Sequence, residues 1–559
     1  MDDNAKELTK RGDKLFGLKA PFDNLCQEIA TNFYSARADF TGKIELGSEF
    51  ASHQVDSFPE LVRRDLANAF ASMLRPSNQQ WFMAHVDDAL ERDNAVRGYL
   101  EYMNKVTSRV LYDPATNMRR TTAEADNDLA AFGNAVISIV DNKNRDGIVM
   151  RSWHLRDCAW AEDEIGGVSA LHRKQKITLA NLARQFGANK VPMKWRAKMD
   201  KDPQSEMTIR HCAVQKENYD PYGAKKTFGG MPWVSIFYTE EGDLLAEIPE
   251  PGMPYVVPRW SKVSTSQYAF SPATIIALPN ARLIQRMMLT LIEAAEKTVD
   301  PPLVATHEAI KSEVDLTAGG ITWIDREYDE RLGEALRPLN LGRNVGLGVD
   351  LLEQQRKMLS EAFYLSKINL PQSREKTAYE TARLVEEYVR NALPLFEPLE
   401  DEYNATILDA VVSRGLRLGA YGPPDMIPEP LRGKDVRFRF VNPLREAMEK
   451  KKVMAFQESA EILAAAAQIN PSSLAQIDVN TMLRDALHGA GAPAGWFKTE
   501  EAMAAEQAQQ MQMQKLQQMA GMVGAGADVA HKVAKADLAT QMAEQGPAPT
   551  AAAGVMGGV

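Results

Sequence analysis

The sequence has few cysteines, and their spacing does not suggest a metal site. Cys26, Cys158 and Cys212 are spread over 559 residues and form no Cys-x-x-Cys pair. Because three is an odd number, a complete disulfide framework is not expected. We predict reduced, mostly buried thiols, as in a protein made in a reducing cytosol.

Long hydrophobic runs are also lacking. The most apolar segment, residues 281–295, is interrupted by Arg282, Gln285 and Arg286. No run approaches the ~18 apolar residues of a membrane span. The N-terminus, Met1-Asp2-Asp3-Asn4, is acidic and unlike a secretory signal. We therefore expect neither a transmembrane helix nor export.

The sequence lacks the motifs of common enzyme classes. It contains no Gly-x-x-x-x-Gly-Lys-Ser/Thr phosphate loop and no Gly-x-Ser-x-Gly nucleophile elbow. Its eight histidines form no His-Glu-x-x-His or His-x-His pair. Acid pairs such as Asp87-Asp88 are usual on solvated helix faces, although a nuclease could use such carboxylates to bind Mg²⁺. We predict no catalytic residue, no cofactor and no metal site.

The composition is that of a globular protein of several domains. The length predicts about three to five domains or subdomains. Hydrophobic residues make up 45% and charged residues 25%, and the net charge is −10. This acidic balance disfavours tight nonspecific binding of duplex DNA over the whole surface.

The first half of the chain has the pattern of an α+β region. Helical spacing predicts a helix from Phe58 that Pro76 stops, a second helical segment over 81–110, and a third helix over 121–132. A helix over 178–187 is predicted from Thr178 as N-cap and Gly187 as stop. The predicted strands are 135–140, 148–153, 168–173, 209–215, 233–238 and 255–257.

The most informative stretch is a helix, a compact insert and a returning helix. Apolar residues at helical spacing predict the first helix over 280–299, and Asp300-Pro301-Pro302 ends it. The insert, 303–346, should hold a short helix (306–314) and a strand (321–324). A flexible glycine-rich run, Gly342–Gly348, should precede the return helix over 349–365.

A polar loop, 367–376, follows the return helix and contains Lys367, Arg374 and Lys376. It is either a basic loop that contacts a polyanion or a solvated connector. The insert leaves a similar choice, because its acidic surface is either a partner-docking site or a solvated subdomain. Thr377 and Glu380 have the spacing of a capping box, which predicts a helix start.

The remaining chain is predicted to be helical with one strand. The pattern predicts helices over 399–418, 443–467, 478–488 and 499–522 and a half-buried strand over 434–441. The Gln/Met-rich segment 499–522 either bundles with other chains or is solvated. Residues 523–559 are rich in Gly, Ala and Pro and are predicted to be disordered.

This order of segments resembles the portal, or head-to-tail connector, proteins of tailed bacteriophages, in particular the short-tailed podovirus type. The resemblance covers about residues 10–520. Thr377-Ala378-Tyr379-Glu380 is similar to the Thr-Ala-x-Glu segment after the channel loop of that family, and Leu370-Pro371 precedes it. The Gln-rich C-terminal region is also similar.

The resemblance implies an α+β, predominantly helical portal-type fold that assembles as a ring, usually of twelve subunits. Its wing would contain residues 1–270 and 377–440, and its two stem helices residues 271–299 and 349–366. The clip would be 300–348, the channel loop 367–376, the helical crown 441–522 and the tail 523–559.

The resemblance also implies partners. Double-stranded DNA would pass through the channel near Lys367, Arg374 and Lys376, and Thr377 and Glu380 would cap the following helix. The clip would dock the terminase large subunit and later tail adaptor and nozzle proteins. Major capsid, scaffolding and internal core proteins are further implied partners, and a membrane is not. The residues expected to dock partners in the clip are Asp325, Glu327, Asp329, Glu330 and Arg331.

The implied location is the unique portal vertex of the virion, after synthesis in the bacterial cytoplasm. Two other classes compete with this hypothesis. A packaging ATPase or nuclease would bind nucleotide or cleave DNA with Mg²⁺. A structural protein without a channel, such as an internal core or tail component, would not form an open ring.

Overall fold

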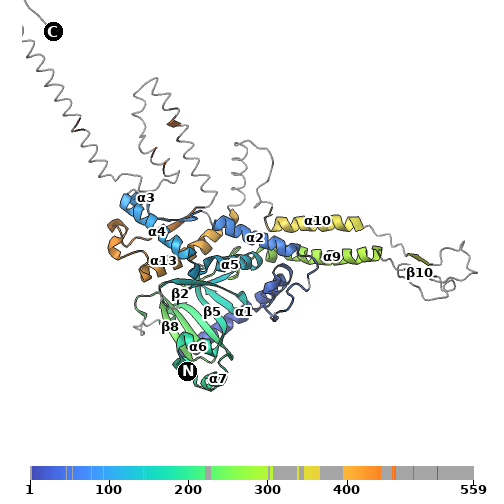
Figure 1. Ribbon diagram of the computed structural model, residues 1–559, viewed down its shortest axis with the longest axis horizontal. Coiled ribbons are helices and arrows are strands. Elements are labelled where there is room, and N and C mark those ends of the chain that lie inside the picture. The colour runs from blue at the N-terminus through green and yellow to red at the C-terminus, as the bar shows by residue number, and fades with distance from the viewer. Residues whose placement is uncertain are drawn as a thin grey trace, which may run out of the picture. The chain divides into compact units, whose positions relative to one another are not determined.

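The computed structural model of the chain is shown in Figure 1. It describes residues 3–441 apart from 221–227, 300–302, 306–335, 339–344 and 366–393 and a few single positions (46, 53, 77, 78, 92, 143 and 145); beyond 441 it describes isolated residues only. The chain forms two compact units. One comprises Met1–Val86 and Tyr99–Ala490, and the other Asp87–Gly98 and Gly491–Val559.

The described chain combines runs of helices with antiparallel sheets, in agreement with the predicted α+β class. The main helices are α1 (Asp3–Phe33), α2 (Phe58–Leu74), α3 (Asp88–Glu91), α4 (Asn94–Tyr112), α5 (Met118–Phe132), α6 (Leu179–Phe186), α7 (Met193–Lys201), α8 (Lys216–Tyr219), α9 (Leu278–Val299), α10 (Val345–Ala362) and α13 (Thr406–Leu418). The helices predicted at 58, 121–132, 178–187, 280–299 and 399–418 are confirmed within a few residues at their ends.

Five antiparallel strands form the larger sheet, in the order β4-β5-β6-β7-β8. Its strands are β4 (Cys158–Glu162), β5 (Val168–Thr178), β6 (Glu206–Gln215), β7 (Trp233–Thr239) and β8 (Leu244–Glu250). Helix α1 packs on it through Ala5 and Leu8, which are buried with Ile236 and Tyr238. Sequence periodicity predicted three of these strands and missed β4 and β8.

A smaller, three-stranded sheet packs in the same core as helices α2 and α5. It has the order β3-β2-β9, from Val136–Asp141 (β2), Ile148–Trp153 (β3) and Tyr255–Val256 (β9). All three strands were predicted. Their inward side chains belong to the main hydrophobic core, together with α2 and α5.

The prediction of one helical segment over 81–110 was wrong at its start. Residues Phe82–His85 form strand β1, which pairs antiparallel with β12 (Arg437–Phe440). Phe82 and Ala84 of β1 are buried while Met83 between them is exposed, and the Trp81 ring stacks on Phe440 with centroids 6.4 Å apart. Pairing with a strand about 350 residues away therefore overrides the local helical pattern. Strand β12 confirms the strand predicted within 434–441.

The C-terminal part of the described fold begins with helical residues 394–399. A π-helical segment, Glu400–Ala405, leads into α13. The π turn directs Tyr403 and Asn404 inward, where Asn404 accepts a hydrogen bond from Arg75 at 2.9 Å. Gly419 ends α13 in the left-handed region, directly after the predicted helix over 399–418. The helices predicted over 443–467, 478–488 and 499–522 lie outside the continuously described residues.

Candidate functional site

Helices α9 and α10 form an antiparallel hairpin that extends from the sheets and from α2 and α5 (Figure 1). The hairpin is tightly packed where Gly348 faces Leu291, because a Cβ on Gly348 would lie 2.6 Å from Leu291 Cδ2. The predicted flexible run over Gly342–Gly348 was wrong from residue 345 onward. There the chain is helical, and glycine serves close helix packing.

The base of the hairpin belongs to the main core. Ile284 of α9 and Leu352 and Leu359 of α10 are fully or almost fully buried. The Phe363 ring lies 5.4 Å from Phe33 of α1, measured between centroids. The hairpin is therefore fixed at its base, while its far half lacks such cover: Val299 at the end of α9 is 87% exposed.

A polar clamp holds one side of the hairpin base. Gln285 Oε1 accepts hydrogen bonds from the backbone N–H groups of Val55 and Asp56 at 2.8 and 2.9 Å, and its Nε2 donates to Asp56 O at 2.6 Å. The buried Asp56 carboxylate pairs with Arg356 of α10 at 2.8 Å. Arg282 pairs with Glu28 of α1 on the same side.

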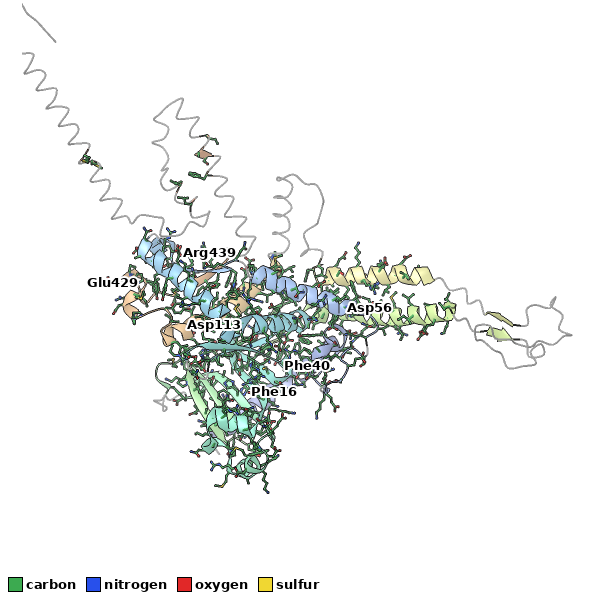
Figure 2. The ribbon with its side chains drawn as sticks, in the orientation of Figure 1. Phe16, Phe40, Asp56, Asp113, Glu429 and Arg439 are labelled. Carbon is green, nitrogen blue, oxygen red and sulfur yellow. The ribbon has the colours of Figure 1, made fainter. Side chains whose placement is uncertain are left out.

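This clamp ends a surface segment that we call the arm, residues 41–55. Its two neighbours, Phe40 and Asp56, are buried and labelled in Figure 2. Between them nearly every described residue is exposed, and the Phe50 side chain is 54% exposed. The side of the hairpin that carries the arm is named the arm flank.

The opposite side of the hairpin, the open flank, is apolar. In a helix each residue advances about 100° around the axis. Leu283 is two residues from Gln285, so the two side chains lie about 200° apart in one direction and about 160° apart in the other. Leu347 likewise lies about 180° around α10 from Arg356. The open flank comprises Leu283, Leu347, Leu351 and Met358, with exposed fractions of 42, 59, 44 and 46%.

One described helix, Ala273–Val299, is long and apolar enough to cross a membrane by length and composition alone. Its best 18-residue window has a mean hydropathy of 1.2, and 22% of it is buried within the chain. A single helix of this kind is weak evidence for a membrane span, since helices of water-soluble proteins meet the same criterion. Of its apolar residues, Leu283 lies on the open flank, and Ile284 is buried at the hairpin base.

The far end of the hairpin opens into the predicted insert. Strands β10 (Leu303–Ala305) and β11 (Leu336–Pro338) pair antiparallel, with Val304 opposite Arg337. The insert therefore begins and ends at adjacent points. The residues predicted to dock partners lie between these strands and outside the described residues: Asp325, Glu327, Asp329, Glu330 and Arg331.

The predicted channel loop also lies outside the described residues. This applies to Lys367, Arg374 and Lys376 and to the capping residues Thr377 and Glu380. The described chain stops at residue 365, directly after α10, and resumes at residue 394. The roles of these five residues therefore stay predictions.

The three cysteines are free and buried, as predicted. Burial raises the pKa of the Cys158 and Cys212 thiols to about 12, so neither is a ready nucleophile. Within the part of the chain that the structure describes, no three His, Cys, Asp or Glu side chains gather to hold a metal ion.

Other buried charges are engaged in pairs that stabilise the fold. Arg75 binds the Asp126 carboxylate at 2.5 Å, and both side chains are buried. Burial raises the pKa of Asp126, and the Arg75 charge opposes that shift. Burial also favours a raised pKa for Asp39, but hydrogen bonds and charges from His154 and Arg156 outweigh it and lower the pKa to about 2.

The arm and its clamp were not predicted from the sequence. Gln285 appeared there only as an interruption of an apolar run. A glutamine on the otherwise apolar part of a helix was the available signal, since such a side chain has to find hydrogen-bond partners when it is covered.

Comparison with known proteins identifies the family. Residues 5–497 match the family described as bacteriophage head to tail connecting protein. This chain belongs to that family. The connector is similar to the "Probable portal protein" of Bordetella phage BPP-1, with 24% identity over 484 residues, 85% of each chain. It is also similar to the "Portal protein" of Salmonella phage epsilon15, with 21% identity over 438 residues and 76% of each chain.

Solved structures of gene transfer agent particles are similar at a coarser level. One, the "Neck of empty GTA particle computed with C6 symmetry", has a TM-score of 0.32 at 10% identity and covers 72% of this connector and 86% of that chain. Another, the "Neck of native GTA particle computed with C12 symmetry", has a TM-score of 0.30 and 11% identity, with the same coverage. The family assignment rests on the sequence match.

Proposed function

We propose that this connector is a portal protein. It assembles into a closed ring of twelve copies at one vertex of the capsid, and double-stranded DNA enters and leaves through the centre of the ring. The observation that carries the proposal is the α9–α10 hairpin, whose two flanks differ and both leave apolar side chains exposed. A cyclic ring needs such a pair of unlike surfaces on each copy, because every contact is head-to-tail.

The same reasoning accounts for the apolar α9 without a membrane. Burying exposed apolar surface stabilises an assembly by roughly 25 cal/mol per Å². A neighbouring copy on each flank would provide this burial. Lipid would have to cover the charged residues of α9 as well, among them Arg286, Glu293 and Lys297.

The remaining roles follow the predicted segments. In the proposed arrangement residues 1–270 and 377–440 form the wing, 271–299 and 349–366 the stem, 300–348 the clip and 441–522 the crown. The clip docks the terminase large subunit and then tail adaptor and nozzle proteins, through Asp325, Glu327, Asp329, Glu330 and Arg331. Capsid, scaffolding and internal core proteins contact the outside of the ring and its crown.

The proposed connector is a conduit and not a motor. The chain carries no phosphate-loop motif, so the terminase would supply ATP hydrolysis. The net charge of −10 per chain favours a lumen that repels phosphate and lets DNA slide. Lys367, Arg374 and Lys376 would supply a few weak contacts to the DNA backbone.

Electron microscopy of the purified protein, combined with native mass measurement, tests the ring. We expect particles with a central hole and a mass near twelve times 62.0 kDa, about 740 kDa. Monomers or dimers that do not close into rings even with scaffolding and capsid protein would contradict the proposal. They would favour a structural protein without a channel.

Replacing Lys367, Arg374 and Lys376 together by Ala tests the channel loop. Ring assembly should be unchanged, because the stem flanks are untouched, and the yield of DNA-filled particles should fall. A matched triple substitution of exposed basic residues on α7 (Lys194, Lys198 and Lys201) is the control. A normal yield of filled particles from the loop variant would remove these residues from the proposed DNA contact.

A further inference from the structure

The arm is an exposed segment that is fixed at both ends. Buried Phe40 and Asp56 fix its ends, and the clamp through Gln285 and Arg356 ties it to the hairpin base. Additional hydrogen bonds hold the N-terminal side, where Gln27 Oε1 accepts from Thr41 N at 3.1 Å. Phe50 lies six residues before Asp56, so the clamp keeps this exposed aromatic side chain near the hairpin base.

An exposed phenylalanine on a fixed segment is costly to leave in water. Burying an aromatic side chain against a partner removes its apolar surface from water, and this stabilises the complex. Aromatic anchors are also common at the centres of protein interfaces. Phe50 therefore calls for an apolar partner surface at the height of the hairpin base.

The open flank offers such a surface at the same height. Leu283 lies two residues from Gln285 along α9, and Met358 lies two residues from Arg356 along α10. Both are nearly half exposed. They lie on the opposite side of the hairpin from the arm, so Phe50 of a chain cannot cover its own open flank without leaving the clamp.

The charges beside these apolar groups are complementary. Glu49 precedes Phe50 on the arm, and Arg286 lies one helical turn after Leu283 on α9. Both side chains are exposed, and neither has an ion-pair partner among the described residues. A second copy placed head-to-tail would bring an acidic and apolar arm against a basic and apolar flank.

We infer that the arm of each copy docks on the open flank of the next, with Phe50 against Leu283 and Met358 and Glu49 paired with Arg286 of the partner subunit. This inference rests on the proposed ring and names the contact that closes it at the stem base. It assigns to residues 41–55 a part in assembly that neither the family match nor the sequence pattern indicated.

Disulfide cross-linking of Phe50→Cys with Leu283→Cys tests the contact in the full chain. The native thiols, Cys26, Cys158 and Cys212, are buried and do not interfere. Under oxidation the double variant should give a ladder of covalent dimers, trimers and higher species. Each single variant should give none beyond symmetric dimers, and a matched pair of Ile165→Cys with Leu283→Cys, at the 97% exposed tip of the β4–β5 turn, should give no ladder.

Measuring the native mass of the same samples before oxidation distinguishes the proposed ring from the proposed arm contact. Rings without a ladder would overturn the arm contact and leave the ring in place. Chains that do not form rings and give no ladder would overturn both. Protection of the arm from proteolysis only after capsid or tail protein is added would assign the arm to another partner, and so would also overturn the inference.

Exchanging the charges of Glu49 and Arg286 tests the proposed ion pair independently of the cross-linking. Glu49→Arg and Arg286→Glu should each raise the concentration at which rings dissociate, by about tenfold for a close interfacial pair. The double variant should restore the wild-type value, because the pair is re-formed with its charges reversed. Equal loss in the single and double variants would contradict the pairing.

Discussion

Gly133 ends α5 in the left-handed region, with φ +74°, and lies directly against the chain before α9. A Cβ at this position would be 2.4 Å from the carbonyl carbon of Phe270, which is backbone and cannot rotate away. The Gly133 carbonyl also accepts a hydrogen bond from Trp260 N at 2.9 Å. A single glycine thus sets the distance between α5 and the segment that leads into α9.

Gly133→Ala should lower the free energy of unfolding by roughly 3 kcal/mol or more, from backbone strain and the clash together. Gly419→Ala is the matched control, because Gly419 has φ +75° with nothing within 4 Å of the added Cβ. The control should show the strain alone, about 1 kcal/mol. Thermal unfolding of the two variants measures the difference, and equal midpoints would contradict the role given to Phe270.

His172 couples α1 to the five-stranded sheet and should make that contact sensitive to acid. Its ring is buried under Gly12 of α1, where a Cβ would come within 2.9 Å of Nδ1. Burial, and then the charges of Arg210 and Arg11, lower the His172 pKa to about 4, while Asp13 opposes the shift. Cys212 faces the other ring nitrogen at 3.6 Å.

The unfolded chain binds a proton at His172 near pH 6.5, and the folded chain only near pH 4. Stability should therefore fall as the pH drops from 6.5 to 4, by about 1.4 kcal/mol per pH unit for one proton. Burial also lowers the pKa of His211, so it adds to the slope in this window. Asp39, with its pKa lowered to about 2, loses its stabilising effect only as the pH falls below about 4 toward 2.

His172→Phe should reduce this slope by about one proton in denaturant titrations between pH 6.5 and 4. Measurements above pH 7, where the histidine is neutral in both states, isolate the packing effect of the substitution. An unchanged slope would show that His172 does not titrate in that window.

At the scale of elements, the clamp at Gln285 should stabilise the arm locally without contributing to the stability of the sheets. Its amide is the acceptor for two backbone N–H groups, so its removal leaves them without that partner. The core residues of α9, such as Ile284, do not depend on it. The arm and the hairpin base should therefore respond separately to substitution.

Gln285→Ala should destabilise the arm locally, by about 1–3 kcal/mol, and leave the main unfolding transition nearly unchanged. Limited proteolysis of unassembled chains should then cut within residues 41–55 faster than in the wild type. Glu293→Ala, an exposed substitution on the same helix, is the control and should not change the cleavage rate. A fall in the global midpoint without faster cleavage would contradict a local role.

The sequence pattern predicted the elements whose signals are local. Thr178 and Gly187 mark α6 correctly, and the Thr178 hydroxyl accepts the Asn181 N–H at 3.4 Å. Periodicity also located α9 and α10. It failed where the partner is distant in the chain: β1 is a strand only because β12 pairs with it. The clamp was missed for the same reason, since Gln285 and Asp56 are joined only by the fold.

At the scale of the whole molecule, the open flank should decide assembly without affecting the folded chain. Leu351 is 44% exposed and lies outside the core, so Leu351→Lys should leave the unfolding midpoint of the monomer unchanged. A lysine buried against a neighbour would be strongly unfavourable, so ring formation should be lost or shifted to much higher concentration. Sedimentation and native mass measurements of the Leu351→Lys variant test whether rings still form.

Ile165→Lys serves as the matched control, since it adds the same charge at the most exposed hydrophobic residue of the sheet region. Rings of this control should have wild-type mass. If the Leu351→Lys variant formed rings at the wild-type concentration, the open flank would not be a contact surface.

The β10–β11 ladder at the far end of the hairpin determines how freely the insert between these strands can vary. Because Ala305 and Leu336 are register partners, the chain leaves the hairpin and returns to it at neighbouring points. The entropy of closing a loop grows only slowly with its length. Segments of very different length and sequence can therefore be exchanged at this point while the spacing of the two helices is kept. The ladder therefore lets the insert change in length and sequence without altering the packing of α9 against α10.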